Sequence, residues 1–192
     1  MTTLETPRTI LRQWRDDDLD AFAAITADPE VMRWIGPGTP LDRDATAARL
    51  RVWQDHWERH GFGLYALVLR DTGELAGFTG LAVPEFLPEV LPAVEIGWRL
   101  ARHQWGRGLA TEAARAVVTH ARDHLALDRL VSIHQVGNDA SARVMLKLGM
   151  HLDRSTVDPT HGHPLRVYAL DLAPTSSPGR AAPSSPAPAH RE

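Results

Sequence analysis

The stretch Glu95-Ile-Gly-Trp-Arg-Leu-Ala-Arg-His-Gln-Trp-Gly-Arg-Gly-Leu-Ala-Thr-Glu-Ala-Ala114 decides the fold of this chain. It predicts a strand, a turn that contains Gly106 and Gly108, and an alanine-rich helix. A helix N-terminus presents unpaired backbone N–H groups and a partial positive charge, which suits a pyrophosphate. Arg102 and Arg107 stand close by in the sequence and can add charge-assisted hydrogen bonds. The stretch is therefore a candidate site for a phosphorylated ligand.

Taken as a bare pattern, Gly106-x-Gly108 is equally typical of a structural turn. It is not a Walker loop, which needs Gly-Lys followed by Ser or Thr. It also lacks the third glycine of the dinucleotide-binding fingerprint. The motifs on both sides of these glycines are therefore needed to distinguish a structural turn from a ligand-binding loop.

Outward from this stretch, hydrophobic periodicity and turn residues predict further elements. The expected helices follow Asp16–Asp18 and Pro29, run from Asp42 or Asp44 to Gly61, and span 106–124 and 138–149. The expected strands lie at 9–14, 64–70, 75–83, 93–100, 130–136, 150–155 and 165–172. The strand–helix–strand order over 93–136 predicts a parallel crossover, and the hairpins predict antiparallel flanks. The expected fold is α/β of the α+β type, with a mixed, mostly antiparallel sheet of about seven strands and helices on both faces.

Composition limits the function classes. The 192 residues carry a net charge of −3 and no cysteine, which excludes disulfides and thiolate catalysis and disfavours a nucleic-acid partner. Neither a signal peptide nor a membrane-spanning apolar run is evident, so we expect a cytoplasmic protein without a membrane partner. Residues 173–192 are rich in Pro, Ala and Ser, and are expected to form a disordered tail after a single domain at 1–172.

The turn and helix resemble the acetyl-coenzyme A loop of the GNAT superfamily, (Arg/Gln)-x-x-Gly-x-(Gly/Ala), here Trp105-Gly-Arg-Gly-Leu-Ala110. The first position departs from the general motif. The spelling Trp-Gly-(Lys/Arg)-Gly-x-Ala-Thr-Glu-Ala is, however, similar to that of the branch around the ribosomal-protein alanine N-acetyltransferases (RimJ/RimL-like). The chain also resembles that branch in three further motifs, which follow one another in the correct order along the sequence. They are Thr9-Ile-Leu-Arg-Gln-Trp14, Glu95-Ile-Gly-Trp98 and the segment from Asn138 through Ser141 to Gly149. The resemblance covers roughly residues 7–172.

The resemblance implies acetyl-CoA as the acetyl donor and a primary amine as the acceptor, either a protein N-terminus or a small molecule. It implies that the pantetheine arm pairs with the backbone of one strand, and that the pyrophosphate lies on the glycine loop. Asn138 would help to hold the pantetheine arm, although helix capping alone explains it equally well. The implied cofactor-binding residues are Trp98, Arg99, Leu100, Arg102, Gly106, Arg107, Gly108, Leu109, Ala110, Thr111 and Asn138.

Direct attack of an amine on the thioester needs a base for the ammonium, donors for the oxyanion and an acid for the leaving thiolate. The resemblance places the oxyanion donor at a backbone N–H near Leu100. Glu95 is the candidate base, and an ion-paired or solvated strand residue is the alternative. Ser141 is the candidate acid or water-holder, and first-turn capping is the alternative. Many members of the family use a tyrosine as the acid, but Tyr65 and Tyr168 both lie outside the 138–149 helix.

The remaining candidates are histidines and one loop. His56 and His60 are spaced i, i+4, but no third ligand is evident, so no metal is expected. His134 and the turn His161-Gly-His163 are candidates for lining the acceptor cleft. The loop 84–92 carries several large apolar residues, which could cover that cleft, meet a second subunit or pack on the sheet edge.

The sequence leaves two matters open. The chain could be a monomer or a homodimer. A non-catalytic acyl-CoA sensor or interaction module is the alternative to an enzyme, because a motif tyrosine is absent.

Overall fold

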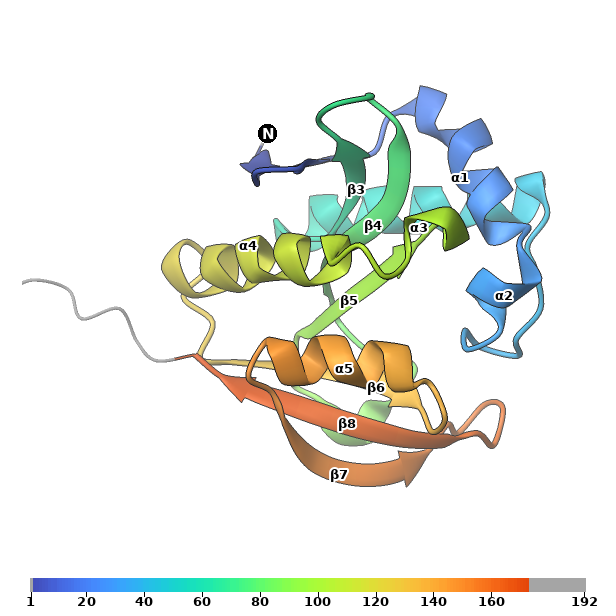
Figure 1. Ribbon diagram of the computed structural model, residues 1–192. Helices are drawn as coiled ribbons and strands as arrows, with labels where there is room; N and C mark the ends of the chain where they lie inside the picture. Colours follow the sequence, from blue (N-terminus) through green and yellow to red (C-terminus); the bar gives the residue numbers. More distant parts are fainter. Residues whose placement is uncertain (1, 173–192) are drawn as a thin grey trace, which may run out of the picture.

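The computed structural model describes residues 2–172, which form an eight-stranded sheet with helices on both faces (Figure 1). The spatial order of the strands is β1-β2-β3-β4-β5-β6-β8-β7, and every neighbouring pair is antiparallel except β5 and β6. The strands are β1 (Leu4–Glu5), β2 (Thr9–Arg12), β3 (Leu64–Leu69), β4 (Leu75–Ala82), β5 (Glu95–Leu100), β6 (Arg129–Gln135), β7 (His151–Val157) and β8 (Pro164–Asp171). The predicted mixed, mostly antiparallel sheet is confirmed. The additional strand is β1, whose two residues are too few to show any alternation. The predicted tail at 173–192 lies outside the described residues.

The two faces of the sheet carry different helices. The helices are α1 (Leu19–Thr26), α2 (Pro29–Met32), α3 (Arg43–His60), α4 (Leu109–Asp123) and α5 (Asp139–Lys147), with short 3-10 turns η1 (Asp16–Asp18), η2 (Pro88–Val90) and η3 (Arg102–Gln104). Figure 1 shows α4 and α5 in front of the sheet and α3 behind it. Alternate residues of β3 illustrate the division, because Tyr65 and Leu67 pack in the core with α4, whereas Leu64 and Ala66 pack in the core with α1 and α3.

Local capping sets where the helices begin and end. Asp42 accepts a hydrogen bond from the Ala45 N–H at 2.8 Å, and Gly61 ends α3 with a φ of 72°. Helix α4 starts at Leu109 rather than at Gly106, where the sequence pattern put it. Gly106 and Gly108 have φ angles of 73° and 78°, and a right-handed helix cannot contain such residues.

The predicted parallel crossover is confirmed, and it opens a gap in the sheet. Strands β5 and β6 are in register at one position, Glu95 opposite Val131, where the Val131 N–H donates to the Val94 carbonyl at 2.9 Å. The other edge of β5 pairs with β4 along the whole of Glu95–Leu100. The β6-facing edge of β5 is therefore open beyond Glu95, and an extended ligand could satisfy its backbone groups.

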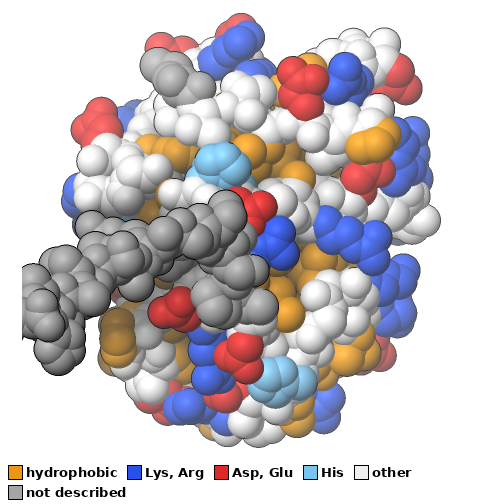
Figure 2. Space-filling view, turned by 90° about the vertical axis from the view of Figure 1, so that its left-hand side faces the viewer, with side chains coloured by type: hydrophobic (Ala, Val, Ile, Leu, Met, Phe, Trp, Pro, Cys, Tyr) orange, Lys and Arg blue, Asp and Glu red, His pale blue; other side chains and the backbone are white. Residues whose placement is uncertain are grey.

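The surface carries charges of both signs. Figure 2 shows basic and acidic side chains interspersed on the visible face, with hydrophobic side chains scattered between them. No helix among residues 2–172 is both long and apolar enough to cross a bilayer.

Candidate active site

Two connected hollows lie beside the open edge of β5. The deep cavity, of about 480 Å³, has walls from α2 and the segment after it, α3, β4, β5, β6 and the loop at 84–92. The loop groove, of about 330 Å³, lies between the end of β5, the glycine loop and α5. Both hollows share the lining residues Trp34, Ile35, Trp98, Arg99, Asn138 and Ser141. A ligand in one hollow can therefore meet a ligand in the other.

The loop groove contains most of the predicted cofactor-binding residues. It is lined by Trp98, Arg99, Leu100, Gly106, Gly108, Leu109, Ala110, Thr111 and Asn138. The indole N–H of Trp105 donates to the Leu100 carbonyl at 2.8 Å and fixes the loop against the end of β5. The first turn of α4 leaves N–H groups unpaired, as every helix start does. Glycine backbone, a helix N-terminus and an open strand edge thus meet in one groove.

The cations in the groove are not the two that the sequence pattern suggested. Arg102 and Arg107 do not line it, and the Arg107 guanidinium donates to the Gln104 side chain instead. Their role in binding stays a prediction. Arg143 and Lys147, one turn apart on α5, line the groove, and sequence reasoning missed both. Their i, i+4 spacing on the helix that follows Asn138 was the available signal.

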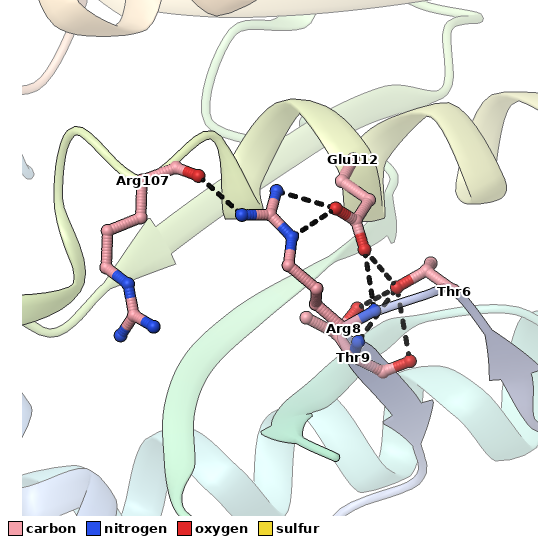
Figure 3. A network of polar contacts seen from close by, with 5 residues as sticks. All are labelled: Thr6, Arg8, Thr9, Arg107 and Glu112. Atoms are coloured by element: carbon pink, nitrogen blue, oxygen red, sulfur yellow. Dashed lines mark hydrogen bonds and ion pairs between the residues drawn. The ribbon is translucent and has the colours of Figure 1, made fainter. Parts of the chain in front are cut away.

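A polar network holds the start of α4 against the N-terminal segment (Figure 3). Glu112 accepts hydrogen bonds from the Thr6 hydroxyl at 2.7 Å, the Arg8 backbone N–H at 2.9 Å and the Arg8 Nε at 2.7 Å. Burial raises the pKa of Glu112, but these bonds outweigh it and leave the pKa lowered. The Arg8 Nη1 also donates to the Arg107 carbonyl at 2.8 Å. Arg8 therefore ties the glycine loop to the first turn of α4.

Glu95 lies on the wall of the deep cavity. The Glu95 residue is half-buried: part of it faces the cavity, and other protein groups cover the rest. Burial raises its pKa to about 7, against the opposing effect of the Ile133 N–H. A carboxyl group with this pKa is partly ionised near neutral pH, so it can exchange a proton with a ligand in the cavity.

Ser141 lies where the two hollows meet. Its backbone N–H donates to the Asn138 Oδ1 at 3.2 Å, so Asn138 caps α5, as one of the two interpretations predicted. Asn138 also lines both hollows, and capping therefore does not rule out contact with a ligand. The structure thus brings Glu95, Asn138 and Ser141 to one continuous space.

Two histidines also line the deep cavity. His134 is buried, its Nδ1 lies 2.8 Å from the Gln135 carbonyl, and its Nε2 has no partner among the described residues. Burial lowers the pKa of His134. His161 pairs with Asp158 at 2.9 Å in the turn between β7 and β8. His134 and His161 are thus positioned to contact a substrate, whereas His163 does not line the cavity.

Of the other candidates, only the loop 84–92 reaches a hollow. His56 and His60 stack at 4.3 Å on α3, and no third metal ligand joins them in the part of the chain that the structure describes. Tyr65 is buried away from the cavity, and burial raises its pKa to about 12. In the loop 84–92, Leu87 packs against Val131 and β8, while Phe86 lines the deep cavity.

The family model of the acetyltransferase (GNAT) domain matches residues 8–151. The chain belongs to the GNAT acetyltransferase family. An N-acetyltransferase of Bacillus subtilis, YoaA, is 30% identical over 76% of this chain and 81% of its own length. A solved acetyltransferase structure from Agrobacterium tumefaciens is 31% identical and covers 88% of this chain and 94% of its own, with a TM-score of 0.73.

A ribosomal-protein acetyltransferase, RimL, solved in complex with coenzyme A, has a TM-score of 0.74. It covers 89% of this chain and 98% of its own at 17% identity, which shows a shared fold. GNAT members use acetyl-CoA as the acetyl donor, and this chain is accordingly an acetyl-CoA-dependent acetyltransferase. The expectation of a GNAT enzyme and its fold is confirmed.

Proposed function

We propose that this GNAT enzyme acetylates a primary amine that enters the deep cavity, while acetyl-CoA occupies the loop groove. The junction of the two hollows at Trp98, Asn138 and Ser141, beside the open edge of β5, carries this proposal. It is the place where a thioester from one side can meet an amine from the other. The catalytic unit is proposed to end near residue 172.

The groove suits the donor in chemical terms. Of the predicted strand residues, Trp98 and the Leu100 N–H would pair with the amides of the pantetheine arm, because they share the β5 edge that bonds β6 at Val94 and has no β6 partner beyond Glu95. The backbone groups of Arg99 point to β4, so Arg99 would line this groove with its side chain. The N–H groups of Gly106 to Ala110 would hold the pyrophosphate, with Thr111 close by. Arg143 and Lys147 would supply the positive charge that phosphates require.

The deep cavity suits the acceptor. Glu95 would take the proton from the attacking ammonium, directly or through water, because its pKa of about 7 lets it act as a base at neutral pH. Ser141 would protonate the leaving thiolate or hold the water that does so. The amine would attack the thioester carbon directly, and the carbon–sulfur bond would break as the amide forms. A protein N-terminus and a small-molecule amine are both compatible with a cavity of about 480 Å³.

The pH dependence of turnover tests this assignment. Thiol release from acetyl-CoA is measured over a panel of amines for the wild type, Glu95→Gln and Ser141→Ala. Loss of the base should reduce turnover by roughly 10²–10⁴-fold near pH 7, and the defect should shrink at higher pH as the amine deprotonates by itself. Ser141→Ala should lower turnover without changing acetyl-CoA affinity, and high pH should not rescue it.

The controls address the alternatives. Glu89→Gln removes an exposed carboxylate from the loop at 84–92 and should leave the profile unchanged. His134→Gln tests the buried imidazole in the cavity, whose Nε2 has no partner among the described residues, and should leave the pH profile of the wild type unchanged if Glu95 is the base. Parallel profiles for the Glu95 and Ser141 variants would contradict the assignment. Coenzyme A binding without thiol release on any amine would instead support the non-catalytic sensor.

A further inference from the structure

A cation without a counter-ion lines the deep cavity. The Arg99 guanidinium lies over the Phe78 ring, 5.2 Å from its centroid, and its Nη1 is 3.4 Å from the Met32 sulfur. Its Nε is buried and has no hydrogen-bond partner in the described part of the chain. No carboxylate among residues 2–172 forms an ion pair with Arg99. A guanidinium that is taken out of water without an anion is costly to the folded protein.

The charges around Arg99 make this cost larger. Arg49 also lines the cavity, and burial together with this second positive charge lowers the pKa of Arg99 to about 10. The cavity has two carboxyl groups. Asp158 is engaged by His161 and by two backbone N–H groups of its own turn, and Glu95 ionises only near neutral pH. The cavity therefore has an excess of positive charge before any substrate enters.

The arrangement of β5 places this charge at a defined point. Side chains alternate along a strand, so Glu95, Gly97 and Arg99 share one face, and all three line the deep cavity. Glu95 and Arg99 are four residues apart, or about 13 Å between Cα atoms. A Cβ built on Gly97 would meet no atom within 4 Å. The space between the carboxyl and the guanidinium is consequently open.

We propose that the amine acceptor carries an oxyanion, a carboxylate or a phosphate, which binds to Arg99 with Arg49 as a second cation. This inference rests on the proposed function and adds the chemical class of the acceptor. The amine lies toward Glu95 and the anion toward Arg99, so the two groups of the acceptor are separated by several bonds. A planar guanidinium donates two parallel hydrogen bonds to such an anion, which a neutral acceptor cannot accept in the same way.

The test compares acceptors of equal length. The panel contains 6-aminohexanoate, its methyl ester and an aminoalkyl phosphate, and kcat/KM is measured for each. A hydrogen-bonded charge should favour the anionic acceptors over the ester by roughly 10–100-fold, and the ratio between carboxylate and phosphate identifies the anion. Arg99→Met should abolish the preference while the acetyl-CoA affinity stays unchanged. Arg51→Met removes an exposed charge from the same helix as Arg49 and should keep it.

A binding measurement makes the result independent of turnover. With coenzyme A at saturation, calorimetry should detect 6-aminohexanoate on the wild type and not on Arg99→Met. Equal use of ester and acid would overturn the inference and leave the proposed function standing. So would an Arg99→Met variant that binds coenzyme A weakly but retains the preference, since Arg99 would then serve the donor. Anion binding without any acetyl transfer would support the anion site and overturn the proposed function.

Discussion

Replacing Arg8 with alanine should weaken coenzyme A binding through the glycine loop. The Arg8 Nη1 donates to the Arg107 carbonyl at 2.8 Å (Figure 3). In a trans peptide the carbonyl and the following N–H point in opposite directions. The contact therefore turns the Gly108 N–H away from Arg8. Without Arg8 this peptide can rotate, because both glycines that flank Arg107 tolerate several backbone conformations.

The structure sets the size of the effect. A hydrogen bond to a charged group contributes about 1.5–3 kcal/mol. In Arg8→Ala the Gly108 N–H remains but is no longer held in one orientation, so only part of its bond to the ligand is lost. We therefore expect a loss of ~1 kcal/mol, or a roughly fivefold to tenfold rise in the Kd of coenzyme A. The fold should survive, because Glu112 keeps the Thr6 hydroxyl and the backbone N–H of residue 8 as donors. The Arg8 side chain is 49% exposed, so its ion pair adds little to stability and the melting temperature should fall by only about 2–4 °C.

Calorimetry with coenzyme A measures the effect, and Arg70→Ala is the matched control. Arg70, directly after β3, pairs with Glu5 of the same N-terminal segment at 2.7 Å, also donates to the Thr6 carbonyl, and is 43% exposed, but it makes no hydrogen bond to the loop. It should reduce stability by a similar amount and leave the Kd unchanged. Wild-type affinity in a folded Arg8→Ala variant would refute the reasoning. Equal losses of affinity in both variants would show that only the packing of the N-terminal region matters.

Three further outcomes are expected from the structure, and a fourth from the composition of residues 173–192. Asp18→Asn should cost about 1.5–3 kcal/mol in chemical denaturation, because the neutral amide offers one oxygen where the carboxylate accepts two 2.7 Å bonds from the largely buried Arg12. Burial raises the pKa of Asp18, but Arg12 and the Arg15 N–H outweigh it and lower the pKa, so the wild type should lose this stability as pH falls through that lowered pKa. Glu95 has a pKa of about 7 in the folded protein, above its usual 4.5. The free energy of unfolding of the wild type should therefore decrease by at most about 3 kcal/mol as pH rises from 4.5 to 7. The melting temperature of the wild type should fall over this range, and that of Glu95→Gln should not show this fall. Gly108→Val places a branched residue at a φ of 78°, and calorimetry should show severe loss of coenzyme A binding in a folded variant. Deleting residues 173–192 should leave the melting temperature and the coenzyme A affinity nearly unchanged, and a drop of several degrees would contradict the expectation of a separate tail.

Much of the fold could be predicted because its signals are local. The glycine turn, the alanine-rich helix and the caps at Asp42 and Asn138 each lie within a few residues of the element that they define. The strand β1 could not be predicted in this way, since two residues gain their strand geometry only from pairing with β2. The sequence pattern predicts the start of α4 three residues early, because it does not reveal that Gly106 and Gly108 adopt left-handed φ angles, which a right-handed helix cannot contain.

The site was only partly predictable for a related reason. The strand and the loop that are proposed to hold the donor come from one contiguous stretch, 95–111, and a pattern can identify them together. The acceptor side is assembled from distant segments, with Arg49 on α3, His134 on β6 and Asp158 after β7. Nothing in the sequence near Arg99 indicates that its side chain lacks a carboxylate partner, because that depends on which segments close the cavity.

In the proposed arrangement, one strand, β5, determines how donor and acceptor meet. Its open edge would face the donor through backbone groups, which any residue supplies, while the side chains at 95, 97 and 99 line the deep cavity. Changing these side chains alters the acceptor site without removing a backbone group from the donor site. Position 97 differs from positions 95 and 99, because any residue larger than glycine there would fill the space between Glu95 and Arg99. We therefore expect substitution at Arg99 to change acceptor choice while donor binding persists.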